Sequence, residues 1–464
     1  MRKRDLTKGS IYNNLIYMSL PAMLGAMAQN FYSLVDMVWV GRLSAEAVAS
    51  ITIFSSLYFI IYVVNNIIGY GSVPIISQSF GSGNKNRTEK AIASSFVLKL
   101  MVGTGAAIFT LLIMKPVMGL FTDEAVVLQG AMRYGLLRTL FMPVVFSSLT
   151  IQSALRCSGD SKSPMFITII ASIINMVLDP IFMFETIPFL GIKGLGLGLF
   201  GVALATIISN TFSFIVGYKI LFGSKSSLSL KFKDLHKPNF PLVKEIFRVG
   251  TPPACAGVVR NIAYLIILRF TTIYGTAAIA TWGILTRLFG LLFMPIEGLL
   301  NGGSAMIGQN IGSGEIDRAN KTAKASAVLG GLSMLILGIF TCLFAPNIMK
   351  LFIDDLKVIE IGAPALRIVS VSLIPIGFYF GLATIFIGSG YTLPLLISGF
   401  VGQWLIQLPF VYFATRVWKL SFIWVAWSFI FYTVSEGSIV LYYYLSNKWK
   451  RSLIRKIAKE KKAS

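Results

Sequence analysis

The chain has 464 residues, of which 55% are apolar and only 13% are charged, and its mean hydropathy is +0.75. Soluble domains carry about twice that charged fraction, so the composition excludes a soluble fold and predicts an integral membrane protein. Three cysteines without CxxC spacing and a single histidine indicate neither a disulfide framework nor a metal cluster.

Twelve apolar segments are each long enough to cross a bilayer, which takes about 20 residues. They lie at 11–40, 47–79, 91–121, 134–156, 163–185, 194–222, 249–275, 277–308, 322–349, 365–388, 391–415 and 418–446. The predicted fold is therefore an all-α membrane protein of twelve transmembrane helices. Its expected parts are an N-terminal lobe at 1–222, a linker at 223–248, a C-terminal lobe at 249–446 and a basic tail at 447–464.

The loops differ in their content of Lys and Arg. The side that carries both termini and the linker holds 27 of these residues, and the opposite side holds nine. Positive loops stay in the cytoplasm, so we expect both termini, the linker and the tail to be cytoplasmic. This asymmetry accounts for the formal net charge of +22 without a nucleic-acid partner.

The two halves of the chain repeat at an offset of 231 residues. Gly81-Ser82-Gly83 matches Gly312-Ser313-Gly314, and Pro21 matches Pro252. Six spans is an even number, so the repeats enter the membrane from the same side and are parallel. We expect two six-helix lobes around a central cleft, as in a secondary transporter.

Acidic residues inside spans are costly and usually functional. Asp36 lies in the first span and Asp179 in the fifth, where Asn175 precedes it by one helical turn. Thr206 in the sixth span adds a hydroxyl. These oxygen ligands suit Na⁺ or a proton better than a transition metal. The alternative is that each carboxylate pairs with an arginine or a helix end.

Other features of the spans support this interpretation. Pro180 and Pro21 each leave a backbone carbonyl without its helical donor, which membranes tolerate where a cavity is lined. Glu297 and Glu436 also lie in spans, and we expect both near span ends with access to water.

The repeat provides an internal comparison for the acidic residues. The counterpart of Asp36 is Ile267, and the counterpart of Asp179, with the neighbouring prolines aligned, is Leu408. The scaffold residues repeat but the acids do not, so the predicted cation site belongs to the first half.

Several segments occur along the chain in a distinctive order: SLPAM, VDMVWVGRL, FGSGNKNRTEKA, ALRCSGDSKSP, NMVLDPIF, GVALATIIS, FMPIEGLLNG and IGSGEIDRANKTA. In combination they resemble the multidrug and toxic compound extrusion (MATE) transporters, across essentially the whole chain. The resemblance implies a prokaryotic plasma-membrane exporter rather than an enzyme, acting on small drug-like, often cationic compounds in exchange for H⁺ or Na⁺. It implies no cofactor beyond that ion, and we expect a monomer.

The resemblance also implies roles for individual residues. It favours the DinF-like branch over the NorM-like branch, because the seventh and tenth spans contain no acid. The implied cation site is Asp36, Asn175, Asp179 and Thr206, with Pro21 as a helix bend; the candidate substrate-cavity residues are Tyr134, Gln152, Met176 and Glu297. Two rivals remain at this point: a flippase or exporter of a lipid-linked precursor, and a channel or receptor that transports nothing.

Overall fold

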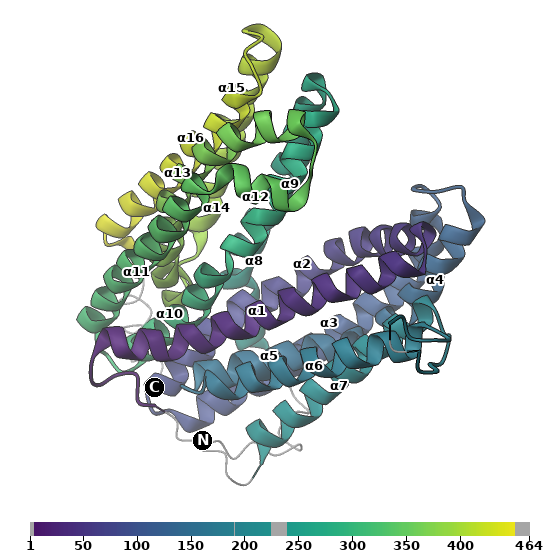
Figure 1. Cartoon of the computed structure of the whole chain (residues 1–464). Helices are drawn as coiled ribbons and strands as arrows, with labels where there is room; N and C mark the ends of the chain where they lie inside the picture. The colour runs from purple at the N-terminus through teal and green to yellow at the C-terminus, as the bar shows by residue number, and fades with distance from the viewer. Residues whose placement is uncertain (1–3, 190, 224–238, 451–464) are drawn as a thin grey trace. The chain divides into compact units, whose positions relative to one another are not determined.

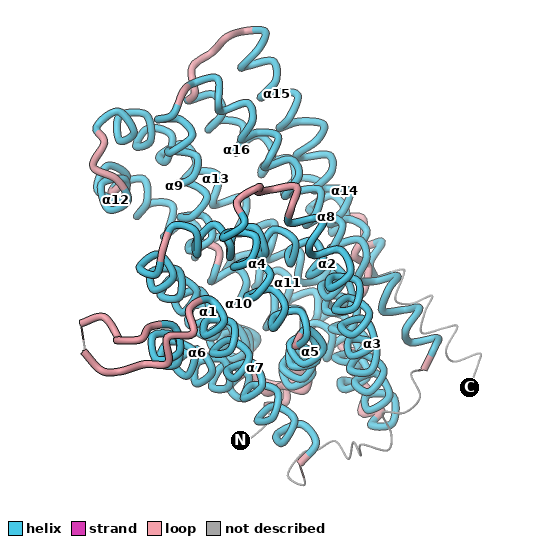
Figure 2. The backbone as a smooth tube through the Cα atoms, turned by 90° about the vertical axis from the view of Figure 1, so that its right-hand side faces the viewer, coloured by secondary structure: helices cyan, strands magenta, loops and turns pink. Residues whose placement is uncertain are grey.

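The computed structural model describes residues 4–189, 191–223 and 239–450. Within these ranges it consists of helices and connecting loops, with no β-strand beyond the isolated bridge between Thr186 and Lys193 (Figure 2). The described residues form two compact units. The first runs from Leu24 to Gly250, and the second combines Asp5–Met23 with the residues that follow Gly250.

The first unit is built from the second part of the first helix, six further helices and the start of α8 (Figure 1). The helices are α1 Ile11–Leu43, α2 Ala45–Gly81, α3 Lys85–Met118, α4 Ala125–Leu140, α5 Met142–Cys157, α6 Lys162–Met183 and α7 Leu199–Phe222. One buried apolar cluster joins α2, α3 and α4 and includes Phe54, Met114 and Tyr134.

The second unit contains the remaining helices, two of which include π-helical turns. They are α8 Phe240–Thr271, η2 Thr272–Tyr274, α9 Thr276–Leu292, α10 Met294–Gly312, α11 Ile316–Leu343, α12 Ala345–Phe352, α13 Leu356–Ser389, α14 Leu393–Phe400, η3 Val401–Gln407, α15 Leu408–Tyr412, η4 Phe413–Val417 and α16 Ile423–Leu445. Its buried cluster is centred on Trp282 and Leu366.

The helices account for the predicted spans. Ten described segments are long and apolar enough to cross a membrane, and the bent pair α4 and α5 makes an eleventh. The 33-residue α1 is also long enough, at about 1.5 Å per residue, but it carries more polar side chains. The fourth span differs from the predicted 134–156, because it begins at Ala125 and bends by 50° between α4 and α5.

The sequence repeat reappears in the helix boundaries. The helices that begin at Ala45, Lys85, Ala125 and Lys162 have counterparts that begin 231 residues later. The later starts are Thr276, Ile316, Leu356 and Leu393. The copies differ in their breaks, since α2 is continuous where α9 and α10 are separate helices, and α13 is continuous where α4 and α5 are separate.

Two helices are divided between the units. Residues 11–23 of α1 belong to the second unit, whereas the lobe boundary expected from the sequence places them in the first. The predicted linker ends earlier than residue 248, because α8 already begins at Phe240; residues 224–238 and the tail from 451 lie outside the described residues. Pro21 falls two residues before the division of α1, and Pro252 follows the division of α8.

Glycines allow these divided helices to pack closely. A Cβ atom on Gly302 of α10 would lie 2.8 Å from the backbone of Met18 and Ser19 in α1. At the equivalent place in the first unit, a Cβ atom on Gly71 would overlap the carbonyl group of Ile246 in α8. Both contacts are between backbones, which cannot move aside as a flexible side chain can.

We expect Gly302→Val to destabilise the protein, because the added side chain would overpack α10 against α1. A loss of about 1–3 kcal/mol is typical of such overpacking, and a thermal melt of the purified protein would measure it. Gly331→Ala on α11 is the control, since nothing lies within 4 Å of its added Cβ. Equal melting temperatures for the two variants would contradict the prediction.

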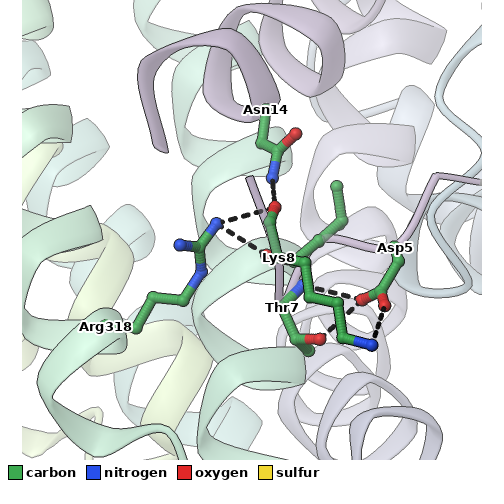
Figure 3. Close-up of polar contacts among 6 residues, drawn as sticks. Asp5, Thr7, Lys8, Asn14 and Arg318 are labelled. Carbon is green, nitrogen blue, oxygen red and sulfur yellow. Dashed lines mark hydrogen bonds and ion pairs between the residues drawn. The ribbon is translucent and has the colours of Figure 1, made fainter. Parts of the chain in front are cut away.

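The segment before α1 is tied to the second unit by hydrogen bonds to its backbone (Figure 3). Arg318 donates to the carbonyl of Lys8 at 3.0 Å, and Asn14 donates to the same carbonyl at 2.7 Å. Within the segment, Thr7 donates to Asp5 from its hydroxyl at 2.6 Å, and this bond holds the pKa of Asp5 below its usual value. These bonds fix the start of α1.

Candidate functional site

Two of the predicted site residues lie on α6 and a third on α7. Asn175 and Asp179 are one helical turn apart and both face the interior, with exposed fractions of 1% and 0%. The contact between Gly201 and α6 positions α7, since a Cβ atom there would lie 2.5 Å from the carbonyl oxygen of Phe182. That approach places Thr206 beside Asn175.

An amide links the α6 carboxylate to α7. With the side-chain amide of Asn175 oriented to satisfy both neighbours, its nitrogen donates to Asp179 Oδ2 at 3.2 Å and its oxygen accepts from the backbone N–H of Thr206 at 3.3 Å. The Thr206 hydroxyl donates to the carbonyl of Val202 at 3.0 Å. Its oxygen therefore retains lone pairs for a further donor or a cation.

Asp36 belongs to the part of α1 that lies in the first unit. It is partly buried, and its Oδ1 atom is buried without a hydrogen-bond partner. A buried acceptor that lacks a donor is costly, and a bound cation or proton would remove that cost. Asp36 and Asp179 also interact electrostatically with each other. Carboxylate, amide and hydroxyl oxygens are the types of ligand that suit Na⁺ or a proton.

Arg138 is a charged neighbour that the sequence reasoning did not assign to the site. Its guanidinium carbon lies 5.3 Å from the ring centre of Tyr58 and 5.7 Å from that of Tyr134, and it interacts electrostatically with both carboxylates. The sequence feature that could have identified Arg138 is its position as a basic residue inside a span, one helical turn after Tyr134.

The other predicted residues occupy separate surroundings. Tyr134 is buried and packs edge-to-face on Phe54 at 5.4 Å. Gln152 accepts a hydrogen bond from Thr168 at 3.3 Å, and Met176 on α6 is partly buried. Glu297 is exposed in the first turn of α10 and belongs to the second unit, so these residues do not form one cluster within either unit. Pro21 lies inside a continuous α1.

Glu436 differs from its predicted position near water. Only 2% of its side chain is exposed, and its carboxylate accepts a hydrogen bond from Arg260 at 3.2 Å. The guanidinium of Arg260 lies 5.5 Å from the ring centre of Phe380. The second unit therefore carries an ion pair between α8 and α16, in which Glu436 is buried and 31% of the Arg260 side chain is exposed. The described residues contain no cluster of three or more His, Cys, Asp or Glu suited to a metal ion.

Comparison with known proteins identifies relatives along the whole chain. The chain is 27% identical over 464 residues to "Probable multidrug resistance protein YoeA" of Bacillus subtilis, with 97% of both chains covered. It is 26% identical to "Multidrug export protein MepA" of Staphylococcus aureus, with 85% of this chain and 86% of MepA covered.

Solved structures show the same fold. An outward-facing multidrug resistance MATE family transporter matches with a TM-score of 0.88 at 21% identity, covering 98% of this chain and 100% of that one. Such transporters have two lobes and twelve transmembrane helices, which confirms the predicted fold class.

The MatE family model matches the chain twice, at residues 21–181 and 252–413. The two matches begin 231 residues apart, which is the offset of the sequence repeat. Together they cover well over half of the chain. The protein is thus a multi-pass membrane transporter and a member of the MATE family.

Proposed function

We propose that this transporter exports organic, cationic compounds from the cell in exchange for H⁺ or Na⁺, using Asp36, Asn175, Asp179 and Thr206 as its coupling site. The observation that carries the proposal is the pair of carboxylates in one membrane-spanning unit, with Asp36 Oδ1 buried and unpartnered. Related chains named as multidrug proteins support export of drug-like molecules.

The coupling follows from the cost of charge in low dielectric. Two carboxylates whose charges interact within a membrane-spanning unit are stabilised when a cation or a proton offsets them. Removing that ion leaves negative charge that an organic cation can offset, so cation and cargo compete for the same electrostatic stabilisation. An anionic lipid-linked precursor would be repelled by the same carboxylates, which makes the flippase alternative less favourable.

Ethidium accumulation in a drug-sensitive host tests this proposal. Cells that express the protein should retain less dye than cells with an empty vector, and collapsing the coupling gradient should abolish the difference. Parallel assays in Na⁺ and Na⁺-free buffer identify the ion. Equal accumulation with and without the protein for a panel of organic cations would reject cationic drug export and favour the lipid-linked alternative.

We propose that the loop between α2 and α3 is cytoplasmic and that the loop between α3 and α4 is external, as the Lys and Arg distribution predicts. In a background without the three native cysteines, an impermeant maleimide should label Asp123→Cys in intact cells. It should label Lys85→Cys only after lysis. Both side chains are exposed, so the reverse pattern would mean the opposite orientation.

A further inference from the structure

Arg138 lies at the end of a broken helix. It belongs to the last turn of α4, just before the chain bends by 50° into α5. Half-helices that end inside a membrane span are common at transporter binding sites. The counterpart of this span, α13, continues unbroken to Ser389, and Val369 occupies the position of Arg138. The break and the arginine thus accompany the carboxylates and are absent from the described copy that lacks them.

The guanidinium group is held by aromatic rings rather than by a direct ion pair. The ring centres of Tyr58 and Tyr134 lie 5.3 and 5.7 Å from its central carbon, which is within the range of a cation–π interaction. In the described part of the chain, no carboxylate oxygen lies within 4.0 Å of Arg138. Val40, Tyr134 and Met183 share one buried cluster, and each lies one helical turn from a charged residue of the site, namely Asp36, Arg138 and Asp179. The charge of Arg138 acts on both carboxylates without direct contact.

The charges of the site can be counted. Asp36 and Asp179 contribute two negative charges when both are ionised, and Arg138 contributes one positive charge that it keeps at any physiological pH. The sum is one negative charge. An uncompensated charge is unfavourable in a membrane interior, and one additional proton or one additional Na⁺ makes the site neutral.

The other titratable neighbours leave this count unchanged. The phenols of Tyr32, Tyr58 and Tyr134 come from α1, α2 and α4, and a phenol is uncharged in water below about pH 10. From α6 and α7 the site receives the amide of Asn175 and the hydroxyl of Thr206, which carry no charge.

The basic side chains of α3 and α5 do not contribute to the charge count of the site. Lys99 and Arg156 interact with each other, and the Lys99 amine lies 3.9 Å from the Cβ position of Gly69 on α2. Gly69 is three turns along α2 from Tyr58, or roughly 16 Å at 1.5 Å per residue. A pair at that distance does not replace Arg138.

We propose that Arg138 is a fixed counter-charge that limits the coupling site to one monovalent cation per transport cycle. This inference rests on the proposed function of Asp36 and Asp179, and it deepens that function by setting the number of ions. Arg138 is a positioning residue in this scheme, because it acts through the two carboxylates. An aromatic anchor alone would have no effect on the number of ions, and this difference makes the proposal testable.

The test counts cations for the full-length protein. We expect the efflux rate to depend on H⁺ or Na⁺ concentration with a Hill coefficient of about one in the wild type and up to about two in Arg138→Gln, which leaves two carboxylates to neutralise. Arg138→Lys should behave as wild type. Arg133→Gln is the matched control, since Arg133 is an exposed residue on the same helix.

A charge-compensating double variant separates charge from packing. Asp36→Asn removes one negative charge, so Asp179 and Arg138 together are neutral without any ion and ion-coupled efflux should be lost. Adding Arg138→Gln to Asp36→Asn restores a single negative charge, and dependence on one cation should return. A structural role for Arg138 would instead make the double variant worse than either single variant.

The outcomes distinguish the two proposals. If Asp36→Asn and Asp179→Asn leave cation dependence intact, the proposed coupling site is wrong. If those variants lose coupling while wild type already requires two cations, or Arg138→Gln still requires one, the counter-charge inference is wrong. Should Arg138→Gln fail to fold, the wild-type count remains decisive. Equilibrium binding of radioactive Na⁺ or, for a proton-coupled protein, infrared counting of protonated carboxyl groups provides that count without transport.

Discussion

Asp36→Asn and Asp179→Asn should each abolish ion-coupled drug efflux at unchanged expression. The amide has the shape of the protonated acid but cannot ionise, so each variant is locked in the form that the site takes after loading. Asp179 is fully buried and its neighbour Asn175 donates to it, and an amide at 179 can still accept that bond. Efflux should fall to the level of vector controls, a loss on the order of 100-fold if coupling supplies about 2.7 kcal/mol.

Matched variants test whether this loss is specific to the site. Asp123→Asn changes an exposed carboxylate in the loop before α4, and it should retain wild-type efflux. Asp36→Asn and Asp179→Asn should melt near the wild-type temperature, since removing unneeded negative charge from a membrane interior does not destabilise it. Wild-type efflux from both site variants, with unchanged H⁺ and Na⁺ dependence, would place the coupling site elsewhere.

The spans and the repeat were readable from the sequence because both depend on local composition. The apolar runs predicted the membrane-spanning helices. The 231-residue offset between Pro21 and Pro252 is also the offset between helix starts in the two units. Boundaries were less accurate where amphipathic turns flank a span. The start of α8 contains Lys244, Glu245 and Arg248, so its first nine residues were assigned to the polar linker.

The candidate site was only partly readable. Asp36 and Asp179 stood out because a carboxylate inside an apolar run needs an explanation. Arg138 did not, because its relation to the carboxylates depends on how the helices of the first unit pack together, and no local pattern encodes that packing. The bend after Leu140 is likewise a tertiary feature, since Pro143 alone is compatible with the start of any helix.

The pairing of Arg260 with Glu436 is also a tertiary feature that no local sequence pattern encodes. The partners are 176 residues apart in the chain, so each appeared in the sequence as an isolated charge in its own span. Gly402 leaves room for the Glu436 side chain, because a Cβ atom on Gly402 would lie 2.8 Å from it. The second unit thus pairs its buried carboxylate with an arginine, whereas the first unit leaves Asp36 Oδ1 without a hydrogen-bond partner.

That difference leads to the largest stability effect that we expect. Arg260→Met should destabilise the protein by about 3–5 kcal/mol, because it leaves the carboxylate of Glu436 buried without its partner. Only 2% of the Glu436 side chain is exposed, whereas 31% of the Arg260 side chain is, so the carboxylate depends on the guanidinium for its compensation. A lower melting temperature of the purified protein, measured with Asp36→Asn as a charge-removal variant in the other unit, would report the loss.

The double variant Arg260→Met with Glu436→Gln provides the decisive comparison. Removing both charges eliminates the unpaired carboxylate, and replacing a buried ion pair by neutral groups of similar volume is often close to neutral in stability. The glutamine fits the space beside Gly402 that the glutamate occupies. We therefore expect the double variant to recover most of the stability that Arg260→Met loses. If it melts as low as the single variant, then Arg260 stabilises the second unit through its packing on Phe380 rather than through its charge.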